Sequence, residues 1–354
     1  MAHRSSKRLC VIPHLSGVGG PSSFQLRLVK GLSAYGIETC HELSDTPYDA
    51  VLVIGGTRQL AGLWRARWRG IPVLQRLDGM NWIHRRYTTG LRHFLRAERG
   101  NLLLSTIRAR MADIVVYQSQ FARSWWERER GPQSKPTYVV HNGVDLTEFH
   151  PAGIGERPTD RYRLLLVEGA LGGGYELGLD HAIALTQRMT KKLDKPVDLM
   201  VAGKTSPETR ARAERNKDVT VRWAGIVPRE RIPELDRSAH LLYAADLNAA
   251  CPNAVIEAMA CGLPVVAFET GALPELVKGD SGRLAPYGGD PWRLDPPDID
   301  GLAHAALEVL SDLSRFQTDA RARAEAAFSL DQMVKGYLTA LGWAEENPGA
   351  WSGK

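Results

Sequence analysis

A short stretch at positions 253–277 restricts the fold more than any other part of the chain. It reads NAVIEAMACGLPVVAFETGALPELV. Its first eight residues favour a helix, which Gly262 and Pro264 bring to an end. Residues 264–268 then form a short apolar run, typical of a strand buried in a parallel sheet. Asn253 is expected to cap the helix, because its side chain can accept a hydrogen bond from a free backbone N–H group. A helix followed at once by a buried strand indicates an α/β fold.

The start of this helix is a candidate anion site. The loop before it, residues 248–252, carries no charge, and the free N–H groups of Asn253, Ala254 and Val255 suit a phosphate. Glu257 lies four residues after Asn253 and therefore on the same helix face. Its carboxylate could accept hydrogen bonds from ribose hydroxyls. The alternative is that Asn253 only caps the helix and Glu257 only complements the helix dipole.

Two further segments have the order strand, glycine loop, helix. Residues 9–12 predict a strand, the loop after it contains Gly19 and Gly20, and a helix is expected over 22–35. Residues 163–167 predict another strand, and the glycine-rich loop 168–178, with Gly169 and Ala170, leads to a second helix. Glycines let backbone N–H groups approach a phosphate closely. Two such units along the chain predict two nucleotide-binding folds that face each other across a cleft.

These motifs resemble the family-four retaining glycosyltransferases, which have the GT-B fold of two Rossmann-like domains. The segment PNAVIEAMACGLPVVAFETGALPELV is similar to the family's donor site, and NGVD at 142–145 is similar to the segment that ends its N-terminal domain. The resemblance implies that Glu257 binds the ribose of a sugar nucleotide. It also implies that Gly19 and Gly20 approach the donor sugar and phosphate, and that backbone groups near Ile226 hold the base. The expected activity is metal-independent transfer, with retention, of a sugar from a UDP- or GDP-linked donor to a hydroxyl acceptor (a glycan, a lipid-linked or a small molecule).

The expected domain organisation follows from length and linkers. A chain of 354 residues exceeds one ordinary domain. We expect an acceptor-side domain over 1–155 and a sugar-nucleotide-binding domain over 156–328. A final segment, 329–354, carries an amphipathic helix at 330–346. The resemblance implies that this helix crosses back to the N-terminal domain.

Three polar side chains near predicted strand ends are further site candidates. A strand is predicted at 71–74, and Asp78 comes four residues after its last residue. Open α/β sheets bind ligands just beyond the carboxyl ends of their strands. Asp78 could orient or deprotonate an acceptor hydroxyl, with His84 nearby, or it is only a turn residue before glycine. Lys204 follows a strand at 197–202 and could reach a phosphate.

The chain departs from the family at two places. The family's first donor-site glutamate would fall at Ala249, and residues 164–187 contain none of the basic residues that the family places on the diphosphate. Lys204, Arg283 or Arg58 are candidate substitutes. These departures keep two alternatives open, a non-catalytic nucleotide-sugar-binding homologue and a sugar-nucleotide epimerase.

Charge and aromatic residues are concentrated in the first half of the chain. Residues 1–150 hold 21 Lys and Arg against 11 Asp and Glu, a net charge of +10, whereas the remainder holds 24 against 29, a net charge of −5. Arginine and tryptophan alternate in WRARWR (64–69), WIHRRY (82–87) and RSWWERER (123–130). Such segments suit an anionic membrane surface or a phosphorylated acceptor. Nucleic acid is a less favoured partner, and the alternative is a solvated basic face with packed tryptophans.

No apolar run approaches the ~20 residues of a membrane span, and the five-residue apolar run at 9–13 is too short for a signal peptide. We therefore expect a cytoplasmic protein, with peripheral membrane contact as an open question. The four cysteines lack metal-ligand spacing, and Cys10 and Cys261 are expected to be packed thiols. Asp298 and Asp300 resemble a metal-binding DxD motif, but their position in a proline-rich loop favours surface or helix-capping roles.

Overall fold

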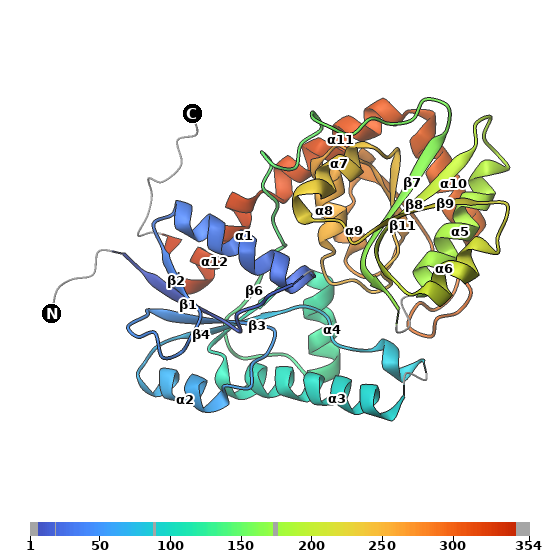
Figure 1. The fold of residues 1–354 in the computed structure, drawn as a ribbon. Helices are drawn as coiled ribbons and strands as arrows, with labels where there is room; N and C mark the ends of the chain where they lie inside the picture. The colour runs from blue at the N-terminus through green and yellow to red at the C-terminus, as the bar shows by residue number, and fades with distance from the viewer. Residues whose placement is uncertain (1–5, 18, 88–89, 173–175, 345–354) are drawn as a thin grey trace. The chain divides into compact units, whose positions relative to one another are not determined.

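The computed structural model describes residues 6–17, 19–87, 90–172 and 176–344. The chain forms two compact units (Figure 1). Unit 1 comprises residues 1–84, 90–143 and 330–354, and unit 2 comprises residues 85–89 and 144–329. Each unit contains a parallel sheet of six strands, so the α/β class and the two Rossmann-like folds predicted from the sequence are confirmed.

Unit 1 has the strand order β2-β1-β3-β4-β5-β6. The strands are β1 (Arg8–Ile12), β2 (Glu38–Cys40), β3 (Ala50–Ile54), β4 (Val73–Leu77), β5 (Ile114–Tyr117) and β6 (Thr137–Val139). The helices are α1 (Gly20–Ala34), α2 (Leu60–Trp68), α3 (Leu91–Thr106), α4 (Gln120–Arg130) and α12 (Leu330–Leu341), and α3 continues into a π-helical turn at Ile107–Met111. β3 and β4 are buried along their whole length, as expected for apolar runs covered on both faces.

Helix α12 is part of unit 1 although it follows the whole of unit 2 in the chain. Its buried side chains, among them Val334, Tyr337 and Leu338, share one core cluster with β1 and α1. The rings of Tyr337 and Phe24 lie 5.4 Å apart between centroids. A helix is therefore present where residues 330–346 predicted one; it ends at Leu341, and residues 345 and 346 lie outside the described part of the chain.

Unit 2 has the strand order β12-β11-β10-β7-β8-β9. The strands are β7 (Tyr162–Leu171), β8 (Val197–Thr205), β9 (Thr220–Gly225), β10 (Leu241–Ala244), β11 (Val265–Phe268) and β12 (Gly282–Ala285). The helices are α5 (Glu176–Thr190), α6 (Pro207–Glu214), α7 (Ile232–Arg237), α8 (Asn253–Ala260), α9 (Leu273–Leu276), α10 (Ile299–Ser311) and α11 (Leu313–Ala327). Its core is built around β10, β11 and α8, and the last two of these lie in the stretch 253–277 that the sequence singled out.

The boundary between the units falls between Gly143 and Val144, upstream of the predicted boundary at 155/156. The reason is packing: Val144 and Phe149 are buried in the core of unit 2. The NGVD segment therefore contains the boundary instead of preceding it.

Two local predictions need correction. Asn253 is the first residue of α8, and Pro252 holds the capping position without a side-chain hydrogen bond. Residues 168–171 continue strand β7 after an irregularity in its pairing with β8, so the loop predicted from Glu168 onward begins later. Part of that loop, residues 173–175, lies outside the described residues. The expected capping role of Asp298 is confirmed, because its side chain accepts a hydrogen bond from the N–H of Gly301 in α10 at 2.8 Å.

Candidate functional site

The topology of unit 2 marks the position of its ligand site. From β7 the chain first adds β8 and β9 on one side, and then adds β10, β11 and β12 on the other. The order of the strands therefore reverses between β7 and β10. In open parallel sheets, ligands bind beyond the carboxyl ends of the strands at such a switch point.

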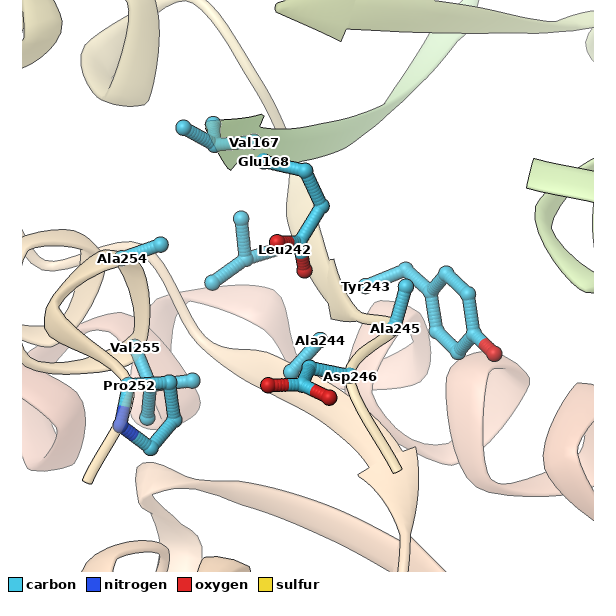
Figure 2. Close-up of a pocket in the computed structure, with 10 residues that line it drawn as sticks. All are labelled: Val167, Glu168, Leu242, Tyr243, Ala244, Ala245, Asp246, Pro252, Ala254 and Val255. Atoms are coloured by element: carbon cyan, nitrogen blue, oxygen red, sulfur yellow. The ribbon is translucent and has the colours of Figure 1, made fainter. Parts of the chain in front are cut away.

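A small cavity lies at this switch point (Figure 2). It is lined by the end of β7, by the end of β10 and the residues after it, and by the first turn of α8: Val167, Glu168, Leu242, Tyr243, Ala244, Ala245, Asp246, Pro252, Ala254 and Val255. Its volume is about 10 Å³, enough for about one water molecule or hydroxyl group. The cavity joins the edge of the sheet to the start of α8, where backbone N–H groups favour an anion.

Two carboxyl groups that the sequence analysis missed line this cavity. Glu168 stands at the end of the buried part of β7, and Asp246 follows β10. Figure 2 shows both carboxyl groups directed to the same space, across from Ala254 and Val255. Burial, and then the charge of Asp246, raise the pKa of Glu168 to about 8, and burial raises the pKa of Asp246 to about 7. The pair therefore retains a proton near neutral pH, so it can both donate and accept hydrogen bonds.

A sequence signal for this pair did exist. Glu168 directly follows the apolar run LLLV, and Asp246 follows LLYAA, so each is the first charged residue after a buried strand. What the sequence did not show is that these two strands are neighbours at the switch point.

The predicted helix residues are divided between two environments. Ala254 and Val255 line the cavity. Glu257 is buried, with 8% of its surface exposed, and its charge is one cause of the raised pKa of Asp236 in α7, after burial itself. Glu257 and Asn253 are not among the residues that line the cavity. The structure thus places Glu257 beside a second buried carboxyl group.

Three other predicted donor-site residues lie together on neighbouring strands. Ala170 of β7 pairs with Lys204 of β8, and Gly169 precedes Ala170; all three are exposed. Lys204 therefore lies within β8, one residue before its end, and not in a loop after it. Ile226, directly after β9, is 58% exposed. The proposed contacts of these residues with a donor remain predictions.

Arg283, a candidate phosphate ligand, has other partners. Its Nη2 bonds Asp280 at 2.8 Å and its Nε bonds Glu308 at 2.6 Å. Its guanidinium also lies 4.5 Å from the centre of the Phe316 ring. Ala249 is buried, and its carbonyl accepts a hydrogen bond from the N–H of Ala272 at 2.8 Å.

In unit 1, the corresponding switch point lies between β1 and β3. Gly19 caps the N-terminus of α1 with a φ of +157°, and its carbonyl accepts a hydrogen bond from Ser23 at 3.0 Å. The helix begins at Gly20, two residues earlier than predicted. Gln25 fixes the loop before it, because its side chain bonds the backbone of both Pro13 and Leu15, at 3.0 and 2.7 Å. The glycine loop is thus held at the sheet edge where a ligand is expected.

Asp78 follows β4 at the same edge and lies two residues after Arg76, so the two side chains point to the same side of the sheet. Burial raises the pKa of Asp78, and the charge of Arg76 acts in the opposite direction. Arg76 itself is only 2% exposed. Its Nη2 donates to Asn142 at 3.0 Å, and its guanidinium lies 3.8 Å from the centre of the Phe24 ring. Among the described residues, its Nε and Nη1 have no hydrogen-bond partner.

His84 is 4% exposed, and its Nε2 lies 2.9 Å from Oε1 of Glu98 in α3. The ring also stands edge-on to Phe94, with 5.1 Å between ring centroids. These contacts account for His84 as a packed histidine.

Within residues 6–17, 19–87, 90–172 and 176–344, no three His, Cys, Asp or Glu side chains gather as a metal-ion site would require. All four cysteines are buried thiols outside any disulfide, as expected for Cys10 and Cys261. In the same residues, no helix is both long and apolar enough to cross a bilayer.

The fold defines the class of the protein: it has the GT-B fold of two Rossmann-like units, and each unit has a candidate ligand site at its switch point. Solved structures support the fold. The sucrose-phosphate synthase of Thermosynechococcus elongatus superimposes with a TM-score of 0.72 at 16% identity, covering 96% of this chain and 100% of that one. A glycosyltransferase from Rickettsia africae gives a TM-score of 0.71 at 16% identity, covering 98% and 100%.

Sequence comparison points to the same class. Residues 163–312 match the family model "Glycosyl transferases group 1", so this segment of the chain is similar to that family. Among curated relatives, a GDP-mannose-dependent alpha-(1-6)-phosphatidylinositol dimannoside mannosyltransferase of Mycobacterium tuberculosis is 28% identical over 239 residues, which cover 65% of this chain and 58% of the relative. A D-inositol 3-phosphate glycosyltransferase of Streptomyces bingchenggensis is 30% identical over 193 residues, covering 49% and 42%. The chain thus spans about half the length of these relatives.

Proposed function

We propose that this protein transfers a sugar from a nucleotide-sugar donor to a hydroxyl acceptor, with retention of configuration and without a metal ion. The observation that carries the proposal is the cavity at the switch point of unit 2. It combines the start of α8 with a proton-holding pair of carboxyl groups, Glu168 and Asp246. Such a site suits a ligand with an anionic part and hydroxyl groups.

The donor proposed for the first assays is GDP-mannose, with UDP-linked sugars as the second choice. One relative is described as GDP-mannose-dependent, and another as an inositol 3-phosphate glycosyltransferase. The acceptors proposed for these assays are an inositol phosphate and a phosphatidylinositol mannoside, after the names of these two relatives. Glu257 is proposed to bind the ribose, and Lys204 to contribute positive charge.

Catalysis on this proposal depends mainly on position. Backbone N–H groups at the start of α8 stabilise the charge that develops on the leaving diphosphate. Asp78 accepts a hydrogen bond from the acceptor hydroxyl and orients it at the sugar. Arg76 favours the ionised form of Asp78, which is the form that accepts that bond.

A second candidate function is nucleotide-sugar binding without turnover. It is favoured by Ala249, which replaces a carboxylate of the family, and by the absence of Lys and Arg from residues 164–187. The two functions share the donor site and differ in whether a product forms.

The first test is calorimetric binding of GDP, UDP and ADP, and of their sugar forms, in the presence of EDTA. We expect one nucleotide to bind, and Glu257→Gln to weaken it roughly tenfold or more, which is what the loss of a charge-assisted hydrogen bond to ribose costs. Asp194→Ala is the matched control, because Asp194 is an exposed carboxylate of unit 2 after α5.

Product formation then separates the candidates. Transfer of mannose to an inositol acceptor supports the enzyme. Tight binding without transfer or donor hydrolysis supports the binding protein, and donor turnover without any acceptor supports an epimerase. If none of the nucleotides binds, the proposed donor site is wrong.

A further inference from the structure

Helix α3 exposes an unusual amount of apolar surface. Leu91 is 73% exposed, Leu95 45% and Leu102 62%. These leucines follow one another at intervals of four and seven residues, so they lie on one face of the helix. Phe94 adds a ring that is 40% exposed. Large apolar side chains gathered on one exposed helix face mark an interaction surface.

A stripe of arginines runs beside these leucines. Arg92, Arg96 and Arg99 are exposed and follow one another at intervals of four and three residues. In the part of the chain that the structure describes, no carboxylate pairs with any of the three. Their charges are therefore available to an external anion.

Helix α2 also exposes large aromatic side chains. Trp64 and Trp68 are 48% and 82% exposed and lie one turn apart, with Arg65 and Arg69 exposed next to them. Arg67, in the groove between these tryptophans and Pro72, is held by Asp113 and by the carbonyl of Arg110, at 3.0 and 2.6 Å. That second bond ties α2 to the π-helical turn that follows α3. Figure 1 shows both helices along one edge of unit 1.

We infer that this surface, formed by Trp64, Trp68, Leu91, Leu95, Leu102 and the arginines beside them, docks unit 1 on an anionic lipid membrane. Leucine and tryptophan side chains insert at the boundary between headgroups and acyl chains, and arginines bind the lipid phosphates. Of the three predicted Trp/Arg segments, the one at 64–69 contributes, whereas Trp125 and Trp126 of the segment 123–130 are buried and do not.

The same observations disfavour other partners. In a two-fold contact between copies of this chain, the arginine stripe of one copy would lie close to that of the other. The repulsion between these like charges would cost free energy. Nucleic acid would use the arginines but leave the leucines in water. A membrane with anionic lipids satisfies both parts of the surface.

The experiment is co-sedimentation of the full chain with vesicles, without donor or acceptor, so it does not depend on the proposed function. Vesicles of phosphatidylcholine are compared with vesicles containing about one third phosphatidylglycerol. We expect binding to the anionic vesicles only, and a steep loss of binding as NaCl is raised from about 0.05 to about 0.5 M. A blue shift of tryptophan fluorescence on binding, lost in Trp68→Phe, would place Trp68 in the lipid.

Two double variants locate the surface. Arg92→Gln with Arg96→Gln should weaken vesicle binding roughly twentyfold, and Leu91→Ser with Leu102→Ser roughly tenfold or more. Controls of equal chemistry are Arg231→Gln with Arg293→Gln, and Leu26→Ser with Ile154→Ser, all at exposed positions elsewhere; circular dichroism verifies that each variant is folded.

Three outcomes would overturn the inference. These are absence of vesicle binding at low salt, vesicle binding that survives in both test variants, and a leucine-dependent dimer or an arginine-dependent DNA complex in a protein that does not bind vesicles.

Discussion

Gly203 shows how one residue fixes the shape of the unit 2 site. It lies in β8 with a φ of +142°, and a Cβ there would overlap the backbone carbonyl of Glu168. By contrast, a Cβ added at Gly169 on the neighbouring strand β7 would meet no other atom within 4 Å. A glycine at 203 therefore allows β8 to approach β7 closely at Glu168, which lines the cavity.

We expect Gly203→Ala to destabilise the protein by roughly 1–3 kcal/mol, through backbone strain and the clash with Glu168. Gly169→Ala, the matched control, should change the free energy of unfolding by less than about 0.5 kcal/mol. Urea unfolding measures both. Equal stabilities of the two variants would contradict the close approach.

The raised pKa of Glu168 has a consequence for stability. An unfolded glutamate titrates near pH 4.3, whereas burial and Asp246 raise the pKa of Glu168 to about 8 in the folded protein. The folded state therefore holds a proton that the unfolded state releases between these values. This group destabilises the fold progressively as pH rises from about 4 to about 8, and the cost is constant above that range.

Glu168→Gln removes this titration. We expect the variant to be more stable than the wild type by several kcal/mol at about pH 8.5, since each pKa unit is worth about 1.4 kcal/mol, and by much less at about pH 5. Differential scanning fluorimetry at both pH values gives the comparison. A difference that does not depend on pH would mean that Glu168 has an ordinary pKa.

At the scale of elements, the contact of α12 with α1 determines how unit 1 is completed. Gly31 of α1 faces Val334 of α12, and a Cβ at Gly31 would overlap the Val334 side chain. The helices approach closely because this position lacks a side chain.

Gly31→Ala should therefore cost roughly 1–3 kcal/mol by overpacking, even though alanine favours helix. Val334→Ala alone should also destabilise, by leaving a cavity. The double variant should be more stable than the sum of the single effects predicts, and a double-mutant cycle measures that coupling. Additive effects would show that the two residues are not in contact.

Some elements could be predicted from the local sequence alone, and others could not. Helix α8, strand β11 and the short helix α9 lie where 253–277 predicted a helix, a strand and a helix start, because propensities and glycine–proline stops act within a few residues. Strand β2 was not predicted, since its three residues, ETC, have no apolar run and depend on pairing with β1. The extension of β7 was missed for the same reason: a glycine after a strand reads as a loop unless a partner strand accompanies it.

At the scale of the whole molecule, the two units differ in whether one continuous segment of the chain provides both the sheet and the core. Residues 144–329 contain all six strands of one sheet and its core. Residues 1–143 contain all six strands of the other sheet, but Met333, Val334, Tyr337 and Leu338 of its core come from α12.

We therefore expect the fragment 144–329 to fold alone and the fragment 1–143 to fold only when residues 330–354 are supplied. Loss of four buried side chains of this size removes several kcal/mol of hydrophobic stabilisation. Heteronuclear NMR spectra of each fragment, with and without a peptide of residues 330–354, test this expectation, because a folded fragment gives well-dispersed amide peaks. A well-dispersed spectrum of 1–143 alone would contradict it.

The sequence by itself determined the α/β class and the presence of two nucleotide-type units, because these depend on local periodicity and on one long motif. It also predicted a ligand site at the start of α8. Only the tertiary structure brought Glu168 to Asp246, assigned His84 to Glu98 and exposed the leucines of α3 beside their arginines. Those facts depend on which strands become neighbours and which helix faces stay uncovered. Contacts between residues far apart in the chain set both, and they leave no local pattern in the sequence.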